Sequence, residues 1–130
     1  DLPGNVKAVI ADCGYTSEWD EFQREADTLH IPWFPVLNAT SVLSKVRDGY
    51  DFKQASALAQ VKKSRIPTLF IHGSSDELVP YSMLGELYAA AACEKEELTV
   101  EGAGHALSSS VAPALYWRTV EDFIAKYLDR

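Results

Sequence analysis

The stretch Pro67-Thr-Leu-Phe-Ile-His-Gly-Ser-Ser-Asp-Glu-Leu-Val-Pro80 decides how this chain is interpreted. Its apolar first half is typical of a buried strand, and Gly73 lets the chain turn sharply after it. Pro80 suits the first position of a helix, so Asp76 lies in the loop between a strand and a helix. The later stretch Leu98-Thr-Val-Glu-Gly-Ala-Gly-His105 repeats this plan and places a histidine after a second strand.

Working outward from these two stretches, the hydrophobic spacing predicts alternating strands and helices. Strands are expected at residues 6–12, 66–71 and 97–100. Helices are expected at residues 17–30, after Pro35 to 48, at 56–61, from 80 and at 113–128, and Ser17 with Asp20 is expected to cap the first of them. Three of these helices carry an apolar stripe at helical spacing: Trp19, Phe22, Ala26 and Leu29 in the first, Val36, Leu37, Val42, Leu43 and Val46 in the second, and Tyr116, Val120, Phe123, Ile124 and Tyr127 in the last. This order predicts an α/β fold with about three parallel strands flanked by helices. Residues 1–130 then form one domain, with a helical insert at about residues 17–62.

Three parallel strands make a small sheet. Parallel sheets are normally covered on both faces and contain more strands than this. The first strand is therefore expected to have an open edge. An open edge pairs readily with another chain segment. We expect either a missing N-terminal portion of the same chain or a second copy, paired through residues 6–11, to cover it.

Composition excludes several classes of partner. The 130 residues are 47% hydrophobic and 24% charged, which is typical of a soluble domain. A net charge of −7 without a long basic run makes nucleic acid an unsuitable partner. No stretch has the length of a membrane span or the layout of a signal peptide, and the compartment stays unknown. Cys13 and Cys93 match no metal spacing and are expected to be free thiols, with a disulfide as the alternative.

The chemistry that the sequence suggests lies in Asp76 and His105. Functional groups of parallel sheets gather beyond the carboxyl ends of the strands, where both residues are expected. A carboxylate bound to one histidine nitrogen orients the ring, so that the other nitrogen can act as a base. The competing interpretation is that Asp76 is a turn residue and that His105 lies in an ordinary surface loop.

Three other residues receive separate interpretations. His72 ends its strand and is expected to be packed or hydrogen-bonded, and His30 is expected to be exposed at a helix end. Asp12, also at a strand end, is an alternative acid.

A nucleophile is missing from these residues. The Gly-x-Ser-x-Gly motif of hydrolase serines does not occur in the chain. The serines at positions 108–110 are expected to open the last helix.

Two loops carry a resemblance to a known family. Phe70-Ile-His-Gly-Ser-Ser-Asp-Glu-Leu-Val-Pro80 resembles the acid loop of the α/β-hydrolases, and Val100-Glu-Gly-Ala-Gly-His105 resembles their histidine loop. Ala11-Asp-Cys-Gly-Tyr-Thr-Ser17 is similar to bacterial members of the prolyl-oligopeptidase-like and esterase-like branch. The chain would be the C-terminal portion of such a serine hydrolase.

The resemblance implies a partial α/β-hydrolase fold in which Asp76 is the triad acid and His105 the general base. The serine and the oxyanion donors would lie upstream of Asp1, so the fragment alone should be inactive. The parent enzyme would cleave an ester, thioester or peptide-like bond of a small-molecule substrate through an acyl-enzyme, without a metal or organic cofactor. Some relatives carry an N-terminal membrane anchor.

The resemblance also implies that the helical insert is a cap over the acyl site. Trp19, Trp33 and Phe34 are then candidates for an apolar substrate pocket, with aromatic core packing as the alternative.

Two other functions remain: a non-catalytic interaction module that keeps a hydrolase-like half fold, and a flavodoxin-like nucleotide binder. The second is disfavoured because no glycine-rich loop follows the first strand.

Overall fold

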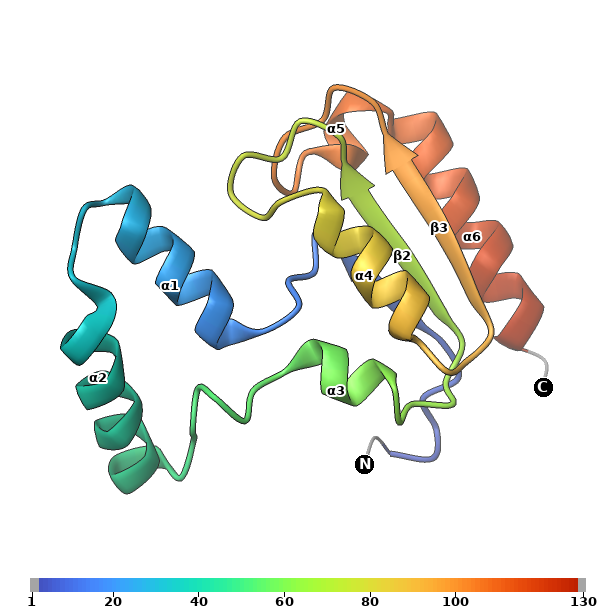
Figure 1. Ribbon diagram of the computed structural model, residues 1–130. Coiled ribbons are helices and arrows are strands. Elements are labelled where there is room, and N and C mark those ends of the chain that lie inside the picture. Colours follow the sequence, from blue (N-terminus) through green and yellow to red (C-terminus); the bar gives the residue numbers. More distant parts are fainter. Residues whose placement is uncertain (1–2, 129–130) are drawn as a thin grey trace.

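The computed structural model describes residues 3–128 and contains one parallel sheet. Its strands are β1 (Val9–Asp12), β2 (Thr68–Gly73) and β3 (Lys95–Val100), in the spatial order β1-β2-β3 (Figure 1). Both strand pairs are parallel, as the alternation of strands and helices predicted. The α/β class and the three-stranded partial sheet are therefore confirmed.

The central strand β2 is buried along its whole length. It begins two residues later than expected, and the Pro67 carbonyl just before it accepts a 2.9 Å hydrogen bond from the Val9 N–H. Successive side chains of β2 point to opposite faces of the sheet, so Leu69 and Ile71 pack on one face and Phe70 on the other. This alternation gives the protein a core on each side of β2.

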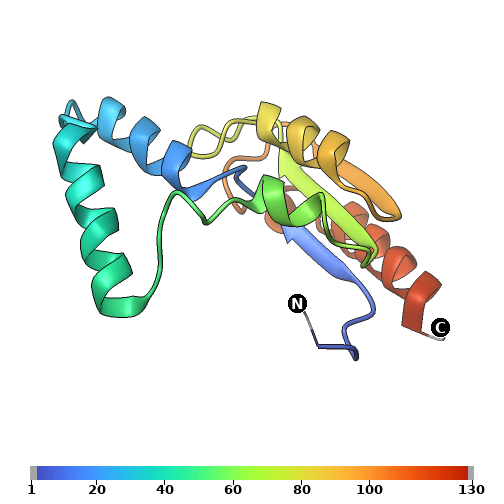
Figure 2. The same ribbon diagram turned by 60° about the horizontal axis from the view of Figure 1, so that its bottom comes forward.

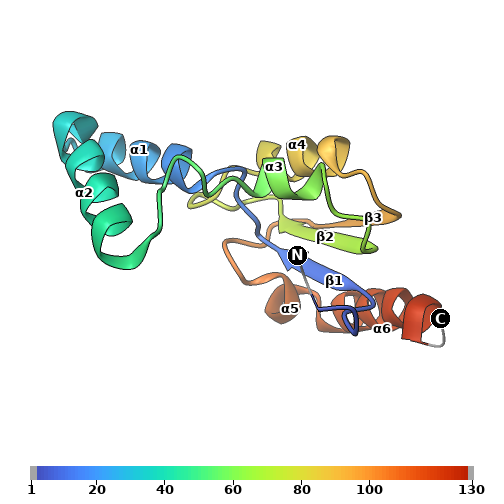
Figure 3. The same cartoon turned by 90° about the horizontal axis from the view of Figure 1, so that it is seen from below.

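Helices cover both faces of the sheet, as Figure 3 shows. On one face lie α3 (Ala57–Val61) and α4 (Ser82–Ala90), and on the other lie α5 (Ser108–Val111) and α6 (Pro113–Leu128). The stripe predicted for the last helix is confirmed, because its aromatic and aliphatic residues pack on Leu69 and Ile71. The buried members of that stripe are Tyr116, Val120, Phe123 and Tyr127.

The expected role of the serines at positions 108–110 is wrong. They do not open the last helix but form the separate short helix α5, capped by Leu107. Pro113 begins α6 after this turn, because a proline at the first helical position lacks only an N–H that the helix would not use.

The strand β1 is shorter and less buried than predicted. It covers Val9–Asp12 instead of residues 6–12, its first three residues are half-buried, and Asp12 is exposed. Within residues 3–128, β1 pairs with β2 alone and therefore forms an edge of the sheet.

Three helices lie between β1 and β2 in the sequence: α1 (Glu18–Thr28), α2 (Trp33–Asp48) and α3. The Ser17 hydroxyl accepts the N–H of Asp20 and caps α1, as the sequence predicted. Gly49 ends α2 with a left-handed φ of 73°. Figures 1 and 2 show α1 and α2 standing beside the sheet rather than on it.

The apolar stripes expected in this segment are mostly not buried. No residue of α1 is fully buried, and Leu29 at its end is 64% exposed. In α2 only Leu37 of the predicted apolar face is buried, because the helix lies away from the sheet. The exposed members of that face are Val36, Val42, Leu43 and Val46.

Cys13 and Cys93 are both free thiols, so the disulfide alternative is wrong. Between residues 3 and 128, no helix combines the length and apolar character needed to cross a membrane.

Candidate active site

Asp76 lies in the loop after β2, and its side chain is fully buried. One carboxylate oxygen, Oδ1, accepts the backbone N–H groups of Leu78 and Val79 at 3.0 and 2.9 Å. The turn that leads to this loop requires Gly73, because a Cβ atom there would stand 2.2 Å from the carbonyl oxygen of Ala103. The loops after β2 and β3 therefore touch through their backbones.

His105 lies in the loop after β3 and joins Asp76 directly. Its Nδ1 atom is 2.9 Å from the other carboxylate oxygen of Asp76, Oδ2. A carboxylate can only accept, so Nδ1 carries the hydrogen of this bond and Nε2 keeps its lone pair. The His105 side chain is 37% exposed, whereas that of Asp76 is fully enclosed. The arrangement therefore presents a basic nitrogen above a buried acid.

The surroundings of Asp76 favour its charged form. Burial alone would raise the pKa of this carboxyl group, but the N–H of Val79, then His105, then the N–H of Leu78 outweigh burial. The pKa of Asp76 consequently lies below its ordinary value. A carboxylate at this place can stabilise a positive charge on His105.

His72 is buried and hydrogen-bonded to the loop that carries Asp76, as expected for this residue. The ring is fully buried, and Nε2 donates to the Val79 carbonyl oxygen at 3.0 Å. The same Nε2 atom lies 3.2 Å from Oδ2 of Asp76. His30 is exposed beyond the end of α1, also as expected.

Asp12 is not paired with His105 in the described residues. Its carboxylate accepts the Tyr116 hydroxyl at 2.9 Å and the Cys13 thiol at 3.3 Å. Burial, followed by this hydrogen bond, raises the pKa of Tyr116 to about 12. Asp76 is therefore the acid that geometry favours for His105.

A cavity of about 390 Å³ opens beside His105. Carboxylates line it from two sides, Asp12 at the end of β1 and Glu21 and Glu25 on α1. Arg24 pairs with both glutamates, yet Oε2 of Glu21 is buried without a hydrogen-bond partner among the described residues. The remaining lining residues are Cys13, Tyr15, Phe22, Leu78, Val79, His105 and Ala106.

The three aromatic residues proposed as a substrate pocket do not line this cavity. Trp33 lines a separate apolar cavity of about 300 Å³ between α1 and α2. The Lys53 ammonium lies over the Trp19 ring, 4.4 Å from its centroid, and Phe34 is 66% exposed. Phe22 lines both cavities and thus lies between them, although the sequence indicated only that it faces inward from a helix.

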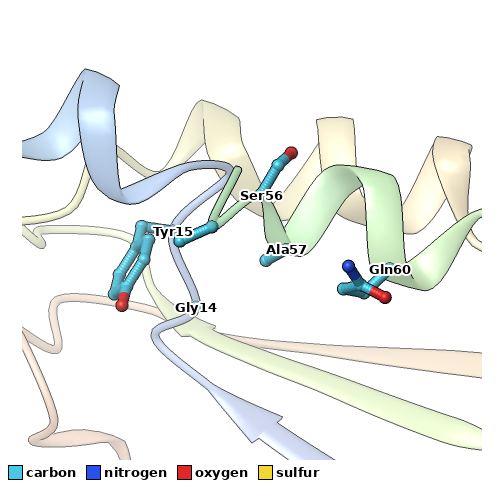
Figure 4. A pocket seen from close by; sticks show the side chains of 6 residues that line it. Gly14, Tyr15, Ser56, Ala57 and Gln60 are labelled. Carbon is cyan, nitrogen blue, oxygen red and sulfur yellow. The ribbon is translucent and has the colours of Figure 1, made fainter. Parts of the chain in front are cut away.

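A third hollow, of about 320 Å³, lies between the loop that follows β1 and the segment that begins α3 (Figure 4). Tyr15 lines this hollow as well as the cavity beside His105. Its other lining residues are small or polar: Gly14, Ala55, Ser56, Ala57 and Gln60.

Comparison with known proteins places this geometry in a wider context. No family model matches the chain. The Bacillus subtilis protein YqkD, described as uncharacterized, is 31% identical over 118 residues, which cover 88% of this chain and 38% of YqkD.

Solved structures share the arrangement of elements. An esterase from Pyrococcus furiosus superposes with a TM-score of 0.69 at 16% identity, over 96% of this chain and 47% of the esterase. An α/β-fold family hydrolase from Bacillus anthracis gives a TM-score of 0.59 at 12% identity, over 90% of this chain and 58% of that protein.

The chain has part of the α/β-hydrolase fold. It spans 38% of the length of YqkD and 47% of the length of the Pyrococcus esterase. Within this partial hydrolase fold, Asp76 and His105 follow the two neighbouring strands β2 and β3.

Proposed function

We propose that this chain is the acid- and histidine-bearing C-terminal part of a serine hydrolase of the prolyl-oligopeptidase-like or esterase-like branch. Asp76 is the acid and His105 the general base. The nucleophilic serine comes from a portion of the protein outside these 130 residues, since the chain contains no Gly-x-Ser-x-Gly motif.

The observation that carries this proposal is the 2.9 Å hydrogen bond between His105 Nδ1 and Asp76 Oδ2. The two residues are 29 positions apart, and each lies beyond the carboxyl end of its own strand. Ligand sites in open α/β sheets lie at this edge. The likeness of the fold to an esterase supports the same reading.

In the proposed mechanism, His105 Nε2 removes the proton from the serine hydroxyl as its oxygen attacks the acyl carbon. Asp76 holds the ring in the required tautomer and stabilises the imidazolium that forms. His105 then gives the proton to the leaving group, and a water molecule activated by the same nitrogen releases the acyl group. These two residues perform only proton transfer and charge stabilisation, so the chain alone has no turnover.

We assign the substrate to small esters or peptide-like molecules, with the segment 17–62 acting as a cap. The cavity between α1 and α2 would receive the apolar part of the substrate, because it is lined mainly by aromatic and aliphatic side chains. Among the three aromatic candidates, Trp33 lines this cavity, and we propose that Trp33 and Phe22 contact the apolar part of the substrate. Trp19 and Phe34 line neither cavity and are not proposed as substrate contacts.

A fluorophosphonate probe, which labels activated serines, tests the proposal on the full-length protein and on residues 1–130. Labelling and turnover of a short acyl ester are expected for the full-length protein, and neither for the 130 residues. Turnover by the isolated residues that persists after treatment with the probe would contradict the proposed division of the triad.

The second candidate is a non-catalytic interaction module. It is favoured by the absence of a nucleophile motif from all 130 residues. It requires that the full-length protein also lack an activated serine, so failure of labelling together with normal folding would select this alternative.

A further inference from the structure

The structure brings together three residues that sequence spacing could not relate. Cys13 follows β1, Asp76 follows β2 and His105 follows β3, so each strand of the sheet supplies one of them. One ligand atom from each, including the Cys13 sulfur, lies within 4.8 Å of the others. No short metal-binding motif marks this set in the sequence, because three helices and a strand lie between Cys13 and Asp76.

The donor set suits a thiophilic divalent cation. Zn²⁺ binds thiolate at about 2.3 Å and imidazole or carboxylate at about 2.0–2.2 Å, in a tetrahedral arrangement. Three donors around such an ion stand roughly 3–4 Å apart, so only a small inward movement of the side chains is required. Three protein ligands leave the fourth position for water, and the cavity of about 390 Å³ beside Cys13 and His105 provides room for it.

The surroundings attract positive charge. The lining residues of the same cavity include Asp12, Glu21 and Glu25 and no lysine or arginine, although Arg24 pairs with both glutamates and offsets part of their charge. Oδ1 of Asp12 lies 3.3 Å from the Cys13 sulfur and could accept a hydrogen bond from the metal-bound water. Carboxylates of this kind commonly surround the ligands of metal sites.

The backbone aims the thiol at this place. Cys13 and Ala106 both have positive φ values, 52° and 55°, which few non-glycine residues adopt. The Ala106 N–H donates to the Cys13 sulfur over 3.3 Å, a normal length for a hydrogen bond to sulfur. The loops after β1 and β3 are thereby held against each other with the sulfur between them.

We propose that Cys13, Asp76 and His105 form a reversible binding site for a thiophilic divalent cation of the Zn²⁺ type, hereafter the cation site. Binding displaces the thiol proton to water, forms the sulfur–metal bond and involves no change of oxidation state. The cation takes one nitrogen of His105. At Nδ1 the ring proton moves by way of water to Nε2, so the bond to Asp76 is lost and Nε2 no longer has a free lone pair; at Nε2 the cation occupies that lone pair directly. Either way the cation would inhibit the hydrolysis proposed above, a consequence that rests on the proposed function, whereas binding itself does not.

Co²⁺ is the probe for the test, because cobalt bound to thiolate absorbs in the near ultraviolet and tetrahedral cobalt in the visible. Titration of the metal-free chain should show one Co²⁺ bound, with a thiolate band that Zn²⁺ abolishes and Mg²⁺ does not. Cys13→Ser should lose the band, whereas the matched control Cys93→Ser should keep it. His105→Gln, at a side chain that is 37% exposed, should weaken binding about 10-fold or more without unfolding the chain.

A wild-type chain without the thiolate band, or a band that survives in Cys13→Ser or disappears in Cys93→Ser, would overturn the cation site. If Cys13→Ser does not fold, the His105→Gln titration decides: unchanged affinity overturns the site. Zn²⁺ should also inhibit hydrolysis by the full-length protein, an effect that depends on the proposed function as well as on the cation site. Cobalt binding to a full-length protein without hydrolase activity would support the cation site and count only against the proposed function.

Discussion

His105 Nδ1 lies 2.9 Å from Oδ2 of Asp76, while Oδ1 of the same carboxylate accepts two backbone N–H groups. One buried side chain thus holds both its own loop and the ring of the next loop. Asp76 should consequently matter for stability as well as for the proposed catalysis.

Asp76→Ala should lower the free energy of unfolding by about 1–3 kcal/mol, because it leaves the N–H groups of Leu78 and Val79 without their acceptor. Asp76→Asn keeps an oxygen and should destabilise less. Glu77→Ala is the matched control at an exposed neighbouring position and should change stability by less than about 0.5 kcal/mol. Urea unfolding of the three variants measures these differences. Equal effects of Asp76→Ala and Glu77→Ala would show that the hydrogen bonds contribute nothing.

Gly73→Ala should destabilise the protein by about 3 kcal/mol or more, because the new methyl group would stand 2.2 Å from the Ala103 carbonyl oxygen and the backbone must move. Gly85→Ala is the control: it lies in α4, its Cβ would meet nothing within 4 Å, and it should stabilise by about 1 kcal/mol. Thermal unfolding distinguishes the two. A stable Gly73→Ala variant would mean that the loops after β2 and β3 do not touch as described.

Stability should fall as the pH rises from 10 to 12. The pKa of Tyr116 rises from 10.0 to about 12 on folding, so the folded state keeps a proton that the unfolded state loses in this range. The contribution is complete below pH 10 and is lost as the pH passes the folded value. Melting temperatures should therefore decline less steeply over this range for Tyr116→Phe than for the wild type. Tyr15→Phe, at an exposed tyrosine, should follow the wild type, and identical slopes for all three proteins would refute the assignment.

The open edge of β1 should allow residues 1–130 to self-associate, as we propose for the segment 6–11. The Val9 and Cys13 N–H groups point to β2, so the Ile10 N–H faces the open edge by alternation. Sedimentation should show a mass that increases with concentration, and Ile10→Pro should reduce this increase by removing the outward donor. A monomer at high concentration would contradict self-association and leave the remainder of the protein as the proposed occupant of this edge.

Much of this fold could be predicted from the sequence, for physical reasons that differ between elements. Helix α6 was predicted with its observed ends because one apolar stripe and Pro113 define it. Asp76 and His105 were predicted to meet because parallel strands end at one edge of the sheet, which the structure bears out.

Other features depend on contacts that no local pattern encodes. The apolar residues of α2 predicted a buried face, but the helix lies beside the sheet and most of that face is exposed. Cys13 could have been noticed, since it follows a strand as Asp76 does. Its approach to His105 depends on a left-handed backbone at Cys13 itself, which a non-glycine sequence does not announce.

The most direct test of the proposed acid–base pair is the kcat/KM of the full-length protein for a short acyl ester, measured for His105→Gln and for the exposed control His30→Gln. His105→Gln should lose about 10²–10⁴-fold in kcat/KM, as expected for removal of a general base, while His30→Gln should retain wild-type activity. Wild-type activity in a folded His105→Gln variant would contradict the role of His105 as the general base.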